Sequence, residues 1–303
     1  MAKTKTPFFG LGAQGSVGES ITAQRRNRTT LLREKPFPTD PYSLPQAYQR
    51  WLYQDYAYLW TQQSAATRAE YRTGGSRFHL TAFQYWMKVM LATLPDIAGW
   101  WRFDSLSAGL TPDSSKNANT GTVIGAFITP GLIAQALSFD GINDKVSCGN
   151  DPSILIDTWS IEAFVKLADK AQQHLICWAT DIPCVSVSWA TNPLIYMGAN
   201  YMRYFSVAAR TTLVDGNWHH VVFQMPGLNE IANSEMYLDG APVGAITTIS
   251  TGAPLAKTTV TLCNRLDGAV RQLQGIADEI ILRNRMLNAT EILRHSLRRY
   301  PAQ

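Results

Sequence analysis

Two adjacent histidines, His219 and His220, are the first residues whose types could do chemistry, because imidazole nitrogens bind metals and transfer protons. They follow Trp218 in a run of aromatic and β-branched residues that is typical of a strand. Neighbouring residues on a strand point to opposite faces of its sheet, so the two imidazoles are not expected to share one ion. We therefore predict packing roles for both histidines.

Carboxylates are the second group to consider, because glycoside hydrolysis uses two of them beside the bond that is cleaved. Asp278 and Glu279 are adjacent in the sequence, so on a regular strand they would face opposite sides of the sheet. No Gly-x-Ser-x-Gly elbow marks a nucleophilic serine either. The sequence therefore predicts no catalytic residues and a protein that is not an enzyme.

The loop from residue 113 to residue 119 offers oxygen ligands at alternating positions. These are Asp113, Ser115, Asn117 and Asn119, whose side chains are of the kinds that bind calcium. Lys116 and the single carboxylate count against an ion there, and the same side chains could instead cap their own backbone. Calcium is the one cofactor that the sequence predicts, with both interpretations open.

Residues 1–39 are rich in glycine, arginine and proline and show no helical periodicity, so we predict an extended basic arm. Its glycine run lacks the Gly-Lys-Ser/Thr ending of a phosphate loop. The arm is expected to dock on an acidic protein neighbour, with nucleic acid as the alternative ligand. The docking residues would be Arg25, Arg26, Arg28 and Arg33.

The two parts of the chain differ in charge. Residues 1–95 hold 12 Lys and Arg against 5 Asp and Glu, whereas residues 96–303 hold 15 against 18, so we expect different surroundings for each. With 46% hydrophobic residues, 303 residues suffice for a large β domain and a smaller one. The chain has no apolar run long enough for a membrane span and does not begin with a secretory signal, so neither the membrane nor the usual export route is expected.

The cysteines are too few and too scattered for a disulfide framework, and no Cys-x-x-Cys pair occurs. They are Cys148, Cys177, Cys184 and Cys263. We interpret them mainly as small buried apolar groups. A Cys177–Cys184 disulfide is expected only in an oxidising environment.

Residues 40–95 have a helical pattern. Aromatic and aliphatic side chains recur at spacings of three and four between Pro45 and Gln63, which is typical of a helix. Ser64 and Thr81 are typical N-cap residues, so two more short helices are expected. The first of these should end at the glycines 74 and 75. We predict a small helical module with an aromatic core.

After Pro95 the pattern changes to short β-like runs separated by Gly, Pro, Asn and Asp, which is typical of an antiparallel sandwich. The strand that contains Ile161 and Glu162 alternates apolar and polar residues, as expected for one buried face. A last helix, from residue 289 to 299, should turn Ile292, Leu293 and Leu297 to one side. Strands are predicted over residues 98–103, 122–128, 136–139, 145–148, 159–167, 174–178, 185–189, 194–197, 202–208, 218–224, 235–238, 245–249, 258–263 and 275–282.

Seven short motifs occur in one order along residues 97–300. They are Trp100–Asp104, Asp113–Gly121, Ala136–Gly141, Trp159–Lys166, Trp218–Val221, Tyr237–Gly240 and Gly275–Ile280. This order resembles the laminin G-like jelly-roll domain of the concanavalin A-like lectin/glucanase superfamily. The resemblance implies two stacked antiparallel sheets with a concave face. We therefore predict a mainly β fold, with a jelly-roll sandwich over residues 96–303 after the arm (1–39) and the helical module (40–95).

The resemblance also bears on chemistry. Glycosidases of this superfamily place carboxylates at alternate positions of one strand, but neither Glu-x-Asp-x-Glu nor Glu-x-Asp-x-x-Glu occurs here. Jelly rolls of this kind often bind calcium near loops such as 113–119. Several aromatic residues could stack on sugar rings along the concave face or simply fill the sandwich. These residues are Trp178, Trp189, Tyr196, Tyr201 and Tyr204.

The first 95 residues resemble N-terminal modules of tailed-phage structural proteins. The basic arm and the segment Thr81-x-Phe-x-Tyr-Trp carry this resemblance. Our leading hypothesis is a virion protein, either a capsid decoration or tail-associated protein. It would form a homo-oligomer that docks on other virion proteins such as the major capsid protein. The alternative is a carbohydrate-binding module of a cell-surface or secreted protein that binds cell-surface glycans. A third hypothesis, nucleic-acid binding by the arm, predicts affinity that falls steeply with salt.

Overall fold

The computed structural model describes residues 15–17, 21–26, 29–34, 43–179, 182–264 and 271–298. The chain divides into two compact units, Met1–Gln46 and Ala47–Gln303. Among the described residues, no helix combines the length and the apolar character needed to cross a membrane.

The N-terminal unit contains an antiparallel sheet of three short strands, in the order β1-β2-β3. The strands are β1 (Gly15–Val17), β2 (Ile21–Arg26) and β3 (Thr29–Glu34). Arg25 and Arg26 lie on β2 and Arg33 lies on β3, so three of the four predicted docking arginines belong to one small sheet. Arg28 falls outside the described residues.

Three helices follow, with bounds close to those predicted. They are α1 (Leu44–Thr61), α2 (Ala65–Ser76) and α3 (Ala82–Thr93). The Ser64 hydroxyl accepts a hydrogen bond from the backbone N–H of Thr67, and Thr81 forms a capping box with Gln84. Both predicted caps are thus confirmed.

The aromatic contacts between these helices centre on Trp86. Its ring lies 5.6 Å from that of Trp60 on α1 and 5.0 Å from that of Tyr71 on α2, measured between centroids. The two glycines predicted to stop α2 lie inside it. At Gly74 a Cβ atom would come within 2.4 Å of the Tyr85 ring, so glycine lets α2 approach α3 closely.

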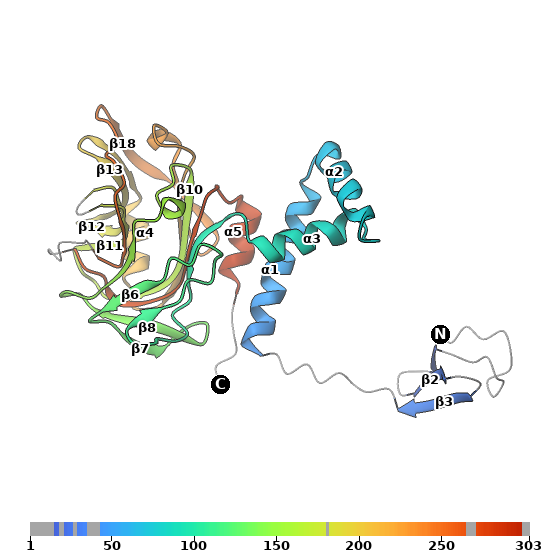
Figure 1. The fold of residues 1–303 in the computed structure, drawn as a ribbon. Coiled ribbons are helices and arrows are strands. Elements are labelled where there is room, and N and C mark those ends of the chain that lie inside the picture. Colours follow the sequence, from blue (N-terminus) through green and yellow to red (C-terminus); the bar gives the residue numbers. More distant parts are fainter. Residues whose placement is uncertain are drawn as a thin grey trace. The chain divides into compact units, whose positions relative to one another are not determined.

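The jelly roll consists of two antiparallel sheets (Figure 1). The first sheet has the order β17-β16-β15-β10-β20-β8-β7, and β4 also pairs with β20. Its strands are β4 (Ile97–Trp101), β7 (Phe127–Pro130), β8 (Gln135–Asp140), β10 (Trp159–Leu167), β15 (Trp218–Met225), β16 (Glu235–Leu238), β17 (Ala241–Val243) and β20 (Gln274–Arg283).

The second sheet has the order β18-β14-β13-β12-β11-β19-β9-β6-β5. Its strands are β5 (Leu110–Thr111), β6 (Gly121–Ile124), β9 (Lys145–Gly149), β11 (Gln172–Cys177), β12 (Cys184–Trp189), β13 (Asn192–Gly198), β14 (Tyr201–Phe205), β18 (Ala245–Ser250) and β19 (Val260–Leu262). The predicted two-sheet antiparallel sandwich is therefore confirmed.

The core lies between the two sheets. Trp159 on β10 and Trp178 just after β11 are both fully buried, with ring centroids 4.9 Å apart. Trp101 on β4 is fully buried as well, and its indole N–H donates to the Asn119 carbonyl at 2.7 Å. Large aromatic side chains thus tie the two sheets together and contribute the most buried apolar area per residue.

A two-residue Asp-Gly turn closes the β16–β17 hairpin. Asp239 and Gly240 connect β16 to β17 with φ values of +51° and +84°. Two successive positive φ values are the geometry of a type I′ turn, which favours the dipeptide Asp-Gly. The Asp-Gly pattern therefore predicted this chain reversal correctly.

Two α-helices of the described part of the jelly roll lie outside the sheets, α4 (Val207–Leu213) and α5 (Ala289–Ser296). The helix α4 replaces the end of the strand that was predicted over residues 202–208. The second begins at Ala289, as predicted, with Asn288 as its N-cap, but its buried face is different. Ile292 is fully buried, whereas Leu293 and Leu297 are 50% and 69% exposed. The side of α5 that faces the sandwich instead carries polar residues, among them Glu291 and His295.

Candidate functional site

Polar side chains gather on the outer face of the first sheet, under α1 and α5. The strands β10, β15 and β20 bring Glu162, His220 and Arg283 to this face, because these residues alternate with core residues along their strands. We call it the helix-covered face and define it by Glu162, His220, Glu279 and Arg283. Nearly all of β10 is buried, so the predicted single buried face of this strand is wrong.

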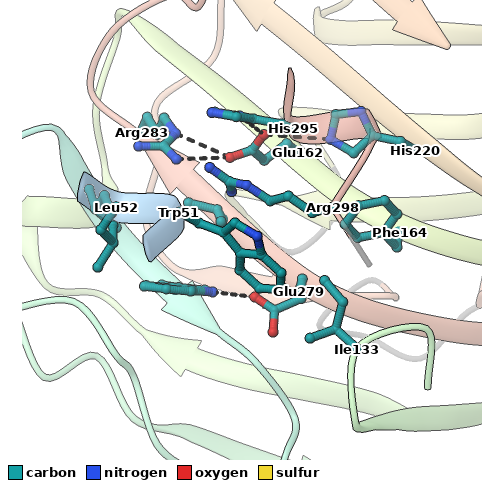
Figure 2. Close-up of a pocket in the computed structure, with 13 residues that line it drawn as sticks. Trp51, Leu52, Ile133, Glu162, Phe164, His220, Glu279, Arg283, His295 and Arg298 are labelled. Carbon is teal, nitrogen blue, oxygen red and sulfur yellow. Dashed lines mark hydrogen bonds and ion pairs between the residues drawn. The ribbon is translucent and has the colours of Figure 1, made fainter. Parts of the chain in front are cut away.

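Glu162 is the centre of this polar cluster, as Figure 2 shows. It accepts hydrogen bonds from Arg283 at 3.0 Å and from His295 Nδ1 at 2.7 Å, and His220 lies 3.5 Å away. Burial raises the pKa of Glu162, but the positive charges of His295 and Arg283 outweigh it and hold the pKa well below its ordinary value. The carboxylate is therefore ionised and fully paired.

The network continues from Arg283 into α1 and the chain that leads to β4. Arg283 donates to Asp96 at 2.9 Å, and Asp96 also accepts from Tyr56 on α1 at 2.7 Å. Asp55, about two turns from Tyr48 on the same helix, pairs with Arg298 and lies 3.2 Å from His295 Nε2. These ion pairs hold α1 and α5 against the sandwich.

Asp278 and Glu279 both point to the helix-covered face, contrary to the prediction from a regular strand. The β10–β20 register shifts here, and Glu279 adopts a φ of +52°, so one extra residue bulges out of β20. Core positions resume at Ile280. The bulge interrupts the usual alternation of successive side chains between the two faces of the sheet.

Both carboxyl groups are hard to ionise. Glu279 accepts hydrogen bonds from the Tyr48 hydroxyl and, at 2.7 Å, from the Trp100 indole N–H. Burial nevertheless raises the pKa of Glu279 to about 8. Burial, with the charge of Glu279, raises the pKa of Asp278 well above its ordinary value, although Asp278 accepts backbone hydrogen bonds from Leu132 and Ile133.

The cavity beside these residues has a volume of only about 10 Å³. That is room for roughly one water molecule, not for a sugar ring. Its walls are Trp51 and Leu52 of α1, together with side chains of the sheet and α5 (Figure 2). The helix-covered face therefore contains carboxylates without space for a substrate, and its arrangement is that of a structural network.

The outer face of the second sheet is different. Tyr196 on β13 pairs with Met202 on β14, and the pair two residues further along, Leu194 with Tyr204, shares this face. Trp189 on β12 packs its ring against that of Tyr196, with centroids 5.8 Å apart. Trp189, Tyr196 and Tyr204 are all partly exposed. These three residues define what we call the aromatic face.

Two of the five aromatic residues considered for sugar stacking belong elsewhere. Trp178 is fully buried and donates from its indole to the Ile154 carbonyl at 3.1 Å. Tyr201 is 4% exposed, and its hydroxyl accepts a hydrogen bond from the backbone of Ile231. Both residues fill the sandwich, which the strand pattern alone did not reveal.

The predicted calcium loop is held by its own hydrogen bonds. Asp113 accepts from the backbone N–H groups of Trp100, Ser115 and Asn119 at 2.7–2.8 Å. The side-chain amides of Asn117 and Asn119 donate to the Ala98 carbonyl. The loop is thus arranged as an Asx-type cap, and an ion would have to displace these bonds. Calcium binding stays a prediction.

His219 and His220 point to opposite faces, as expected for adjacent strand residues. His220 belongs to the helix-covered face, whereas His219 lies between Asp239, at 2.7 Å from Nδ1, and Asp215, at 3.0 Å from Nε2. Although burial lowers it, the hydrogen bond to Asp239 has the larger effect and raises the pKa of His219. The two imidazoles are therefore separate, and each has carboxylate neighbours.

One group of metal-binding side chains was not predicted. Within the part of the chain that the structure describes, a group of three or more such side chains occurs at His174, Cys177 and Cys184, all buried. The sequence signal was the spacing of His174 and Cys177 on one strand, but it lacks the regularity of a Cys-x-x-Cys motif. All four cysteines lie in the described residues and are buried, and no disulfide joins any two of them there.

Comparisons with known proteins agree with the fold. Residues 140–293 match the family model Laminin_G_3, described as the concanavalin A-like lectin/glucanases superfamily. No curated protein sequence matches the chain.

Among solved structures, the binding domain of Paraclostridial Mosquitocidal Protein 1 is similar, with a TM-score of 0.51 and 11% identity over 66% of this chain and 52% of that one. Domain 4 of the arabinanase AbnA from Geobacillus stearothermophilus, in complex with arabinotriose, has a TM-score of 0.49 and 17% identity over 66% and 98% of the two chains. The present chain thus spans about half of the toxin domain. At such identities the likeness to the toxin domain shows the fold alone.

Proposed function

Because the chain belongs to the concanavalin A-like lectin/glucanases superfamily, we propose that it is a non-catalytic, lectin-like protein that binds glycans on its aromatic face. The observation that carries this proposal is the difference in solvent access between the aromatic face and the helix-covered face. Tyr196 and Tyr204 are partly exposed on neighbouring strands, whereas the carboxylates of the helix-covered face have room for about one water molecule.

The geometry of the aromatic face suits a sugar. Tyr196 and Tyr204 occupy diagonal positions on β13 and β14, for which a separation of about 7–8 Å is typical. Aromatic rings present apolar faces on which the C–H groups of a pyranose or furanose ring can lie, while the phenol hydroxyl groups can form hydrogen bonds. Polar side chains nearby, such as that of Arg271, whose guanidinium carbon lies 4.1 Å from the Trp189 ring centroid, could orient the hydroxyl groups of the sugar.

A glycan array probed with the full-length protein tests this proposal. We expect defined glycans to bind, and Tyr196→Ala to abolish the signal without unfolding the protein. Tyr53→Ala is the matched control, because Tyr53 is 47% exposed on α1. Repeating the array with a chelator tests whether the Asp113 loop makes binding depend on calcium. Binding that survives Tyr196→Ala and Tyr204→Ala together would exclude the aromatic face.

As a second candidate we propose a virion protein, with the N-terminal unit docking the chain on an acidic partner such as a major capsid protein. The supporting observation is the placement of Arg25, Arg26 and Arg33 on one three-stranded sheet in a unit separate from the jelly roll. In this candidate function, the chain would form a homo-oligomer and would display its jelly roll outward on a capsid or a tail.

This candidate predicts that mass spectrometry of purified virus particles detects the chain. Removing residues 1–40, which leaves α1 in place, should abolish incorporation while the jelly roll keeps its thermal unfolding transition. The charge reversal Arg25→Glu with Arg33→Glu should act in the same way. Normal incorporation of either variant would contradict docking through this unit.

A further inference from the structure

Three side chains that favour transition metals converge on the outer face of the second sheet, beside the aromatic face. They are His174 and Cys177 on β11 and Cys184 on β12. Their ligand atoms, one imidazole nitrogen and two sulfur atoms, all lie within 4.8 Å of one another. All three side chains are fully buried.

The local fold explains why they meet. Cys177 and Cys184 are direct cross-strand partners near the turn that joins β11 to β12, so their side chains share one face. His174 is paired with Ser186, two residues beyond Cys184, and therefore points to the same face. On a regular strand, two residues that are three apart, such as His174 and Cys177, would face opposite sides of the sheet. Register shifts on both sides of His174 interrupt this alternation and bring the histidine toward the cysteine pair.

His174 provides an independent indication of a ligand. Its side chain is 0% exposed, yet among the described residues neither ring nitrogen has a hydrogen-bond partner. A buried imidazole without any partner is costly, and such groups in native proteins usually have a bound ion or water in place of a protein partner. The ring packs against Trp189, with centroids 6.0 Å apart and planes 26° apart, so its orientation is set by packing.

We propose that His174, Cys177 and Cys184 bind a thiophilic divalent cation, with Zn²⁺ as the best match. Thiolate and imidazole are the ligands of tetrahedral zinc, at about 2.3 Å for sulfur and about 2.0–2.1 Å for nitrogen. These bond lengths place neighbouring ligand atoms roughly 3.3–3.8 Å apart, within the spread found here. Calcium and magnesium are excluded as occupants because they require oxygen ligands.

The set has three protein ligands, so a tetrahedral ion would keep a fourth position for a water molecule or another ligand. Two thiolates and a neutral imidazole carry a charge of −2, which Zn²⁺ neutralises, so burial of the complex is less costly than burial of the bare ion. Because Cys184 pairs with Tyr196 across β12 and β13, the ion would also brace the strand that carries the aromatic face.

Metal analysis of the full-length protein, purified under reducing conditions and titrated with Zn²⁺, tests the site directly. We expect one equivalent of zinc to be retained after dialysis. Replacing zinc by Co²⁺ should produce the intense visible absorption of a tetrahedral thiolate complex, a readout that needs no variant. A Co²⁺ spectrum typical of octahedral oxygen ligands would overturn the proposal.

Variants locate the ion. Cys184→Ser and His174→Gln should each lower the zinc content to below about one tenth of an equivalent, a tenfold loss. Cys148→Ser is the matched control, because Cys148 is also a buried thiol but lies outside the group, and it should keep the full equivalent. The proposal fails if zinc content is the same in all variants. It also fails if intact mass shows that Cys177 and Cys184 form a disulfide in the protein as purified from a reducing lysate.

Discussion

The two outer faces of the jelly roll differ in how their polar groups are satisfied. On the helix-covered face, Arg283 pairs with both Glu162 and Asp96, these two carboxylates also bond to residues of α5 and α1, and the remaining space holds about one water molecule. On the aromatic face, tyrosine and tryptophan rings are partly exposed, and beside it His174 is buried with no hydrogen-bond partner for its ring nitrogens in the part of the chain that the structure describes.

This difference leads to separate expectations for stability and for binding. A buried ion pair is weak evidence for net stabilisation, but the loss of one partner from it is strongly destabilising. We therefore expect substitutions on the helix-covered face to unfold the protein, and substitutions on the aromatic face to affect binding. The predictions below test this contrast.

The largest effect is expected for Arg283→Met. This change leaves Glu162 and Asp96 buried with less compensation, which typically costs about 3–5 kcal/mol. Urea denaturation followed by tryptophan fluorescence measures the free energy of unfolding. Arg77→Met, at an exposed arginine after α2, is the control and should change it by no more than about 0.5 kcal/mol. Equal effects at both positions would mean that the buried network does not hold the helices.

A smaller effect is expected for Tyr48→Phe. The change removes the hydroxyl that donates to Glu279 and, at 3.0 Å, to Asp104, while the ring stays in place. Two buried or partly buried carboxyl groups lose a partner, so we expect a loss of about 1–3 kcal/mol in the free energy of unfolding. The same denaturation experiment measures it. A neutral result would indicate that water replaces the hydroxyl.

The pH dependence of stability provides a third test, through Glu279. Its pKa is raised from 4.5 to about 8 by burial, so its stabilising contribution is complete below about pH 4.5 and is lost as the pH rises toward 8. The free energy of unfolding should fall over this range, by at most about 1.4 kcal/mol per pH unit for one group. Glu279→Gln should flatten the decline.

Part of the decline should remain in that variant because of His295. Burial lowers the pKa of His295, but the charges of Glu162 and Asp55 outweigh this and raise it. The contribution of His295 to the free energy of unfolding is therefore complete below about pH 6.5 and is lost at higher pH. Denaturation curves recorded at intervals from pH 4.5 to 8 measure both slopes. An unchanged slope in Glu279→Gln would mean that Glu279 is already ionised at the acidic end.

The smallest effect is expected for Tyr204→Phe, which deletes the same atom as Tyr48→Phe on the other face. The Tyr204 hydroxyl contacts the Met202 sulfur and lies in a partly exposed position. We expect a change within about 0.5 kcal/mol in the free energy of unfolding. A loss as large as that of Tyr48→Phe would remove the distinction between the two faces.

Much of the fold could be predicted from local patterns. The strand at residues 159–167 and the strand at residues 235–238 have the predicted bounds, because alternation and Asp-Gly turns are local properties. The caps at Ser64 and Thr81 could be predicted for the same reason. Within the sandwich, the strands β5 and β17 were missed, since two or three residues are too few to form a period.

The polar network could not be predicted in this way. Arg283 and Glu162 are 121 residues apart, and Asp55 and Arg298 are 243 apart, so no sequence spacing relates them. One signal was present in the sequence. Asp55 interrupts the stripe of aromatic residues along α1, and a charged residue at such a position requires a buried partner.

The sequence by itself therefore determined the sandwich, its turns and its helix caps, because each depends on residues that are neighbours along the chain. Only the tertiary structure decided what the side chains do. It placed α1 and α5 over the carboxylates, turned Glu279 to the same face as Asp278 through a bulge, and brought His174 to Cys177 and Cys184. Each of these outcomes depends on strand register and on packing between distant segments, which local sequence patterns do not contain.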